Sequence, residues 1–149
     1  MATRPSASDP HDLARFVDAQ APVWQQVMAE LRDARKRSHW MWFVFPQLRG
    51  LGTSAMAERY GIASRAEARA YLAHPVLGPR LAEATAAMLA APRGATALAV
   101  LGPPDDVKFR SSMTLFAAVD GAGSPFAAAL DRYFGGVRDP ATLALLGER

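Results

Sequence analysis

The sequence predicts an all-α protein, an irregular orthogonal bundle of seven to nine short helices around a single layer-packed core. Apolar residues recur at the i, i+3, i+4 spacing of one helix face in segment after segment. Recognisable helix-start signals precede most of these segments. The alternation of apolar and polar residues that marks half-buried strands does not recur in the sequence. These observations favour helices throughout.

Asp or Ser followed directly by Pro marks the predicted start of three helices, because the first residue can cap a helix and the proline suits its first position. The pairs are Asp9-Pro10, Ser124-Pro125 and Asp139-Pro140. The first predicted helix ends near Gln20, and Pro22 starts a second that runs to about Leu31. All three starts are therefore expected to be well defined.

A capping box predicts the best-defined helix of the chain. Ser64 and Glu67 have the spacing at which each side chain satisfies a free backbone N–H of the first turn. We therefore expect a helix from about Arg65 to Ala73, stopped by His74-Pro75. Another helix follows over Leu77 to Leu89.

Three further helices complete the predicted bundle. A short one covers Ala95 to Leu101, and a longer one, capped by Asp105, runs to about Val119. The third follows Ser124-Pro125 and carries apolar residues from Phe126 to Phe134. It ends at Gly135-Gly136, since glycine favours the left-handed conformation that closes helices.

Length and composition restrict the class of protein. The 149 residues match the usual size of one domain, and we expect residues 1–8 to form a flexible tail and residues 9–149 a single helical domain. The absence of cysteine excludes disulfides and thiolate chemistry. The three histidines lie far apart, so we expect no metal site and no cofactor. Without a secretory signal or a long apolar stretch, we expect a cytoplasmic protein that does not enter a membrane.

The segment Arg35 to Gly50, which we call the aromatic segment, is the most informative part of the sequence. It contains two of the three tryptophans, and the stretch from Arg32 to Arg49 has a charge excess of four in a chain whose net charge is +3. The apolar run from Trp40 to Phe45 fits a short buried helix or a buried strand, because periodicity does not separate them. We expect a helix capped by Ser38, with a strand as the alternative.

Two interpretations of this segment remain open. In one, the aromatic side chains belong to the core, while Arg35, Lys36 and Arg37 are solvated near the end of the preceding helix, whose dipole favours cations. In the other, aromatic faces and cations form the rim of a pocket for an anionic ligand that carries a ring. The second interpretation predicts a binding site.

A second segment, Asp105 to Phe116, provides the other predicted wall of this pocket. As a helix it is apolar on all sides, which predicts burial, and its polar side chains would then need partners or a polar cavity. Asp105, Lys108 and Ser112 would lie on one face. The alternative is that Asp105 only caps the helix and Lys108 pairs with a carboxylate such as Glu58 or Asp131.

These observations define the candidate residues. The expected ligand-binding residues are Lys36, Arg37, Ser38, His39, Trp40, Trp42, Gln47, Arg49, Lys108, Arg110, Ser111 and Ser112, and the candidate catalytic residues are His39, Asp105, Lys108 and Ser112. The expected ligand is an anionic small molecule, with a nucleotide among the candidates. The alternative function is a non-catalytic protein-interaction module that uses the exposed part of Arg35 to Gly50. A local excess of four charges disfavours nucleic acid.

The segment Lys36 to Leu48 resembles the signature of a bacterial and fungal family called domain of unknown function 1810, some of whose members carry the name calpastatin. Asp12 to Ala19, Tyr71 to Gly78 and Lys108 to Phe116 resemble its remaining blocks in the same order. The resemblance implies an all-helical fold and no established activity. This compact apolar chain lacks the disordered, repeat-built character expected of a calpain inhibitor.

Overall fold

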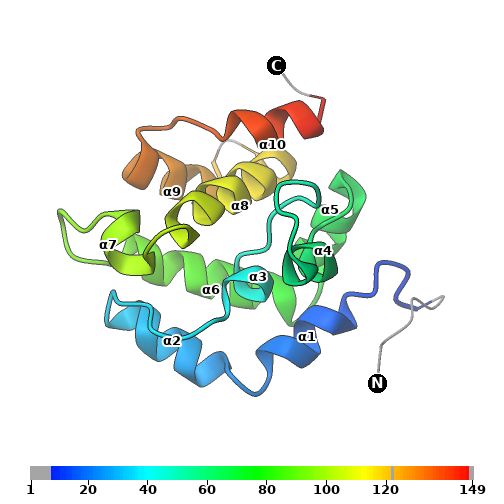
Figure 1. Ribbon diagram of the computed structural model, residues 1–149, viewed down its shortest axis with the longest axis horizontal. Coiled ribbons are helices and arrows are strands. Elements are labelled where there is room, and N and C mark those ends of the chain that lie inside the picture. The colour runs from blue at the N-terminus through cyan, green and yellow to red at the C-terminus, as the bar shows by residue number, and fades with distance from the viewer. Residues whose placement is uncertain (1–7, 122, 148–149) are drawn as a thin grey trace.

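The computed structural model describes residues 8–121 and 123–147 of the chain. Within these residues the protein is all-α, as predicted, with no strand and with ten helices where seven to nine were expected (Figure 1). The helices are α1 (Ala14–Gln20), α2 (Trp24–Arg32), α3 (Met41–Val44), α4 (Ala55–Tyr60), α5 (Arg65–Ala73), α6 (Leu77–Leu89), α7 (Ala97–Leu101), α8 (Asp105–Asp120), α9 (Pro125–Phe134) and α10 (Pro140–Leu145). The flexible tail expected over residues 1–8 lies, except for Ser8, outside the described residues. No described helix is long and apolar enough to cross a membrane.

Helix α8 runs through the middle of the molecule and contacts α5, α7, α9 and α10 (Figure 1). Its burial on all sides confirms the prediction from its apolar pattern, and every residue from 111 to 117 is buried. Phe109 packs edge-on against Phe45, with ring centroids 4.9 Å apart, and Phe116 packs against Tyr71 at 5.4 Å. The core therefore joins the aromatic segment after α2 to α5 and α8.

The predicted helix starts are confirmed at three of the four signals. The side chains of Ser64, Ser124 and Asp139 each accept a hydrogen bond from a backbone N–H in the first turn of the following helix. Asp9 differs, because α1 begins later, at Ala14. The Asp9 carboxylate still accepts from the backbone nitrogens of Leu13, at 2.8 Å, and Ala14, at 3.0 Å.

Two expected caps are wrong. The apolar run after Ser38 is a helix, as predicted, but the residue before α3 is Trp40, and the Ser38 hydroxyl donates to the buried carboxylate of Glu30 instead. Asp105 is the first residue of α8 and not its cap, which is Pro104. Its carboxylate pairs with two lysines, and these ion pairs replace the expected capping bond.

The short helix α4 was not predicted. The Ser54 hydroxyl caps it by accepting from the Ala57 backbone nitrogen at 3.1 Å, but no glutamate at the third position completes a capping box. Its six residues bury the side chain of Tyr60 alone, so the sequence carries almost no helical periodicity there. This helix matters because it contacts α3 beside the candidate site.

Candidate functional site

A buried carboxylate on α2 holds the bend that leads into α3. The Glu30 side chain accepts hydrogen bonds from the backbone nitrogens of Arg37, at 2.7 Å, and Ser38, at 2.9 Å. It also accepts from Trp40 Nε1 at 3.0 Å, from Gln26 Nε2 at 2.7 Å and from the Ser38 hydroxyl. Glu30, which the sequence analysis did not single out, therefore orients the start of the aromatic segment.

Glu30 is ionised in the folded protein. Its burial alone would raise its pKa, but the hydrogen bonds from Ser38, Arg37 and Gln26 outweigh this effect and lower the pKa from 4.5 to about 2. Among the ion pairs of the described residues, none involves Glu30. Hydrogen-bond donors rather than a cation therefore stabilise this buried charge.

Lys36 ties the aromatic segment to the helices α7 and α8. Its backbone nitrogen donates to the Val100 carbonyl at 2.7 Å, and its Nζ lies 2.9 Å from Asp105 Oδ2. The same Nζ donates to the Ser38 carbonyl and lies 5.0 Å from the centre of the Trp40 ring. With 7% of the side chain exposed, Lys36 is buried and has a full set of partners.

Lys108 shares Asp105 with Lys36 but is held more loosely. Its Nζ lies 3.9 Å from Asp105 Oδ1, too far for a hydrogen bond, and 5.1 Å from the centre of the Trp42 ring. It donates no hydrogen bond to any residue that the structure describes. Because the Asp105 carboxylate pairs with two ammonium groups, the cluster of Lys36, Asp105 and Lys108 has a net charge of +1. Lys108 has fewer interactions in this cluster than Lys36.

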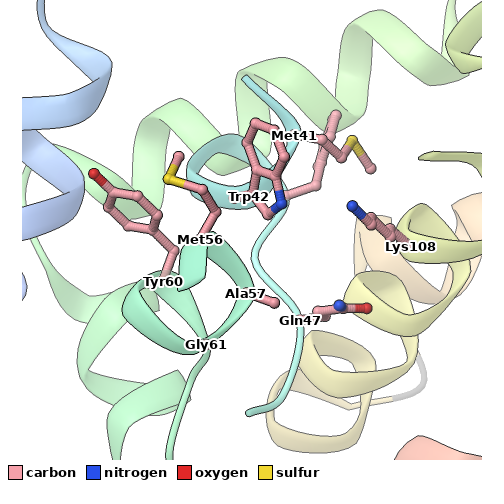
Figure 2. Close-up of a pocket in the computed structure, with 9 residues that line it drawn as sticks. Met41, Trp42, Gln47, Met56, Ala57, Tyr60, Gly61 and Lys108 are labelled. Carbon is pink, nitrogen blue, oxygen red and sulfur yellow. The ribbon is translucent and has the colours of Figure 1, made fainter. Parts of the chain in front are cut away.

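A small cavity lies in front of Lys108, between the aromatic segment, α4 and α8 (Figure 2). Its lining residues are Met41, Trp42, Phe45, Gln47, Met56, Ala57, Tyr60, Gly61 and Lys108. The free space is ≈ 10 Å³, about that of one water molecule. Two segments that lie far apart in the sequence therefore line one cavity, together with the unpredicted helix α4.

Four polar groups of the lining residues have no hydrogen-bond partner among the described residues: Lys108 Nζ, Trp42 Nε1, the side-chain amide of Gln47 and the hydroxyl of Tyr60, which points away from the other three. Figure 2 shows the nitrogens of Trp42 and Lys108 turned toward the gap between them, with the Gln47 amide below this gap. The rest of the lining is mostly apolar. The cavity thus combines an apolar wall with three unused donors.

Three other residues predicted in the aromatic segment lie away from this cavity. Arg37 is exposed and pairs with Asp33 at 2.9 Å. His39 is exposed and does not line the cavity. Arg49 lines a separate depression beside α4, and its guanidinium lies 3.3 Å from the Gly61 carbonyl. The structure therefore groups Trp42 and Gln47 with Lys108, and it places these three residues elsewhere.

The predicted polar residues further along α8 hold the connection between α9 and α10. Arg110 donates to the carbonyls of Val137 and Arg138 at 2.8 and 2.9 Å. The Ser111 hydroxyl lies 3.2 Å from a carboxylate oxygen of Asp139. These contacts give partners to the buried Ser111 and the half-buried Arg110 without a ligand.

Ser112 is fully buried, and its hydroxyl makes no hydrogen bond with the described residues. No hydrogen bond therefore joins Ser112 to Lys108, as a Ser-Lys catalytic pair would require. Within the described residues, no group of three or more His, Asp or Glu is arranged to hold a metal ion. The cavity therefore presents one ammonium group and two neutral donors, from Lys108, Trp42 and Gln47.

The comparisons with known proteins agree with the helical architecture. The profile of a family described as "Protein of unknown function (DUF1810)" matches residues 10–146. A crystal structure of the conserved hypothetical protein Rv1873 from Mycobacterium tuberculosis is 56% identical in sequence, with a TM-score of 0.91. That match covers 95% of this chain and 100% of the other. None of the curated proteins compared matches this chain.

Proposed function

This chain belongs to the DUF1810 family of proteins of unknown function, and from its site we propose that it binds a small anionic molecule at Trp42, Gln47 and Lys108. The observation that carries this proposal is the set of three unpaired donors around one apolar cavity. None of the three is among the fully buried unpaired polar atoms, so water reaches these donors and an anion would take the place of that water. An anion would accept from all three and would also offset the +1 charge that Lys36, Asp105 and Lys108 share.

The size of the cavity limits what can enter. A space of ≈ 10 Å³ admits about one non-hydrogen atom, such as a methyl carbon, so the anionic group would stay at the mouth of the cavity, and a nucleotide base would have to displace Met41 or Met56 or remain outside. Methionine side chains are flexible enough to move in this way. We therefore place the anionic group of the ligand at Lys108 and treat a nucleotide as a ligand that requires the cavity to widen.

A thermal-shift series tests the proposal. Acetate, inorganic phosphate and AMP are titrated against the wild-type protein, the variant Lys108→Met and the control Arg93→Gln, which removes an exposed cation from the loop after α6. An anion at about 100 times its Kd stabilises the native state by about 2.7 kcal/mol, a shift of roughly 5–10 °C at this chain length.

We expect this shift for at least one anion in the wild type and in Arg93→Gln, and none in Lys108→Met. A shift that survives in Lys108→Met would show that the anion binds elsewhere. The absence of any shift across the series would contradict the proposal.

No observation favours the protein-interaction alternative. The exposed residues of the aromatic segment are polar or glycine, namely Arg35, Arg37, His39, Arg49 and Gly50. The large hydrophobic residues that are exposed in the described parts of the chain lie outside it, at Leu98, Val107, Val137 and Leu145. An apolar docking patch would need such residues beside the cations of the segment.

A further inference from the structure

The charge around Lys108 sets the charge of the ligand. Lys36, Asp105 and Lys108 together carry +1, and their side chains are 7%, 17% and 24% exposed. One negative charge therefore neutralises the cluster. A phosphate monoester carries about −1.5 to −2 at neutral pH, so it would add uncompensated negative charge beside Asp105. In a partly enclosed site this repulsion is screened much less than in water.

The shape and polarity of the cavity point to the same class of anion. A carboxylate has two oxygens, which accept hydrogen bonds in one plane, and three donors from Lys108, Trp42 and Gln47 are enough to satisfy them. The lining also includes the side chains of Met41 and Met56, which suit a methyl or methylene group. The ≈ 10 Å³ of free space leaves room for a very short apolar end.

We infer that the ligand is a small free carboxylic acid with a short alkyl end, its carboxylate on Lys108, Trp42 and Gln47 and its alkyl end against Met41 and Met56. This inference rests on the proposed function, because it names the class of anion at that same site. It assigns Asp105 a role in specificity, as the fixed negative charge that disfavours dianions.

Nuclear magnetic resonance of the indole N–H groups provides the test. The chain has three tryptophans, so three indole signals are expected, and Trp42→Phe identifies the one that faces the cavity. Trp40, whose Nε1 donates to Glu30, serves as an internal control. The probes are propionate, methyl phosphate and propionamide, which have similar size but carry one, about two and no negative charges at neutral pH. N-acetylalanine, which carries the carboxylate of a peptide C-terminus, is the fourth probe.

We expect propionate to shift the Trp42 signal saturably and the Trp40 signal little. Methyl phosphate should bind about tenfold more weakly, and propionamide should give no saturable shift. Methyl phosphate binding equal to or tighter than propionate would overturn the carboxylate inference and leave anion binding intact. If no probe shifts the Trp42 signal, or if propionamide matches propionate, the proposed function fails as well. Binding of N-acetylalanine that is tighter than that of propionate would overturn the assignment to a small acid with a short alkyl end and would indicate the C-terminus of a peptide.

The variant Asp105→Asn tests the specificity role directly. Removing its charge should improve the affinity for methyl phosphate relative to propionate by about tenfold, whereas an unchanged ratio would overturn the role of Asp105. Because this variant also removes the ion-pair partner of Lys36, the wild-type series alone decides the inference if the variant does not fold.

Discussion

Glu30 shows how a single buried residue organises the region around the candidate site. Its carboxylate accepts from Trp40 Nε1 and from the backbone of Arg37 and Ser38, and the Ser38 carbonyl in turn accepts from Lys36. Lys36 then pairs with Asp105. The position of the Asp105 carboxylate therefore depends, through these contacts, on Glu30, which does not line the cavity.

The pH dependence of stability should report on Glu30. Its pKa of about 2 in the folded protein is lower than its ordinary 4.5, so the folded state binds fewer protons. The stabilisation is therefore fully present above about pH 4.5 and is lost as the pH falls toward 2. The difference corresponds to about 3 kcal/mol. Urea unfolding between pH 2 and pH 6 measures it.

The variant Glu30→Gln should lack most of this pH dependence. At neutral pH it should lose about 2–4 kcal/mol of unfolding free energy, because an amide N–H₂ would face donors that now bind a carboxylate. Glu83→Gln is the matched control, since Glu83 is half exposed and its pair with Arg32 at 3.5 Å contributes less than about 1 kcal/mol. Equal effects of the two variants would show that Glu30 is not the group responsible.

The positions of the charged and aromatic residues in the sequence predicted part of the candidate site. Lys36 and Lys108, the two lysines of the chain, meet at Asp105, and Trp42 lies with Lys108 in the cavity. Glu30 was missed although its position was a signal: with Val27 and Leu31 it falls on the buried side of α2. A carboxylate on an apolar face needs donors, but the sequence does not show which residues supply them, because the bend over residues 35–40 has no periodic pattern.

At the scale of elements, local signals predicted helices wherever capping and periodicity agreed. They failed where a tertiary contact competed, as at Ser38, whose hydroxyl binds Glu30 instead of capping α3. They also failed at α4, which is too short to show a period. That helix brings Met56, Ala57 and Tyr60 to the cavity, so this part of the lining could not be predicted.

The junction of α5 and α6 supports a prediction at this scale. Gly78, in the first turn of α6, lies so close to α5 that an added Cβ would be 2.1 Å from the Leu72 carbonyl oxygen. Gly78→Ala should therefore separate the two helices and cost about 2 kcal/mol or more in unfolding free energy. Gly123→Ala is the control, because a Cβ there meets nothing within 4 Å. Denaturant unfolding of both variants measures the difference, and a neutral Gly78→Ala would contradict this packing.

For the whole molecule, α8 is the element that unites the core and the site. It packs against α5, α7, α9 and α10, while its first turn carries Asp105 and Lys108. The aromatic segment reaches this turn through Lys36, which lies about seventy positions earlier in the sequence. Such long-range pairing is not visible in local patterns, which explains why Asp105 was predicted to lie beside Lys108 but its ion pair with Lys36 was not.

The two lysines should therefore differ in their effect on stability. Lys36→Met leaves Asp105 with its looser partner, and because it breaks a buried ion pair it should cost about 2–3 kcal/mol. Lys108→Met should cost less than about 1 kcal/mol, since Lys108 is more exposed and lies 3.9 Å from the carboxylate. The double variant should cost more than the sum of both, because Asp105 then loses every cation partner that the described residues provide. Urea unfolding of the wild type and the three variants measures these values, and equal costs for the single variants would show that Lys108 is as much a structural residue as Lys36.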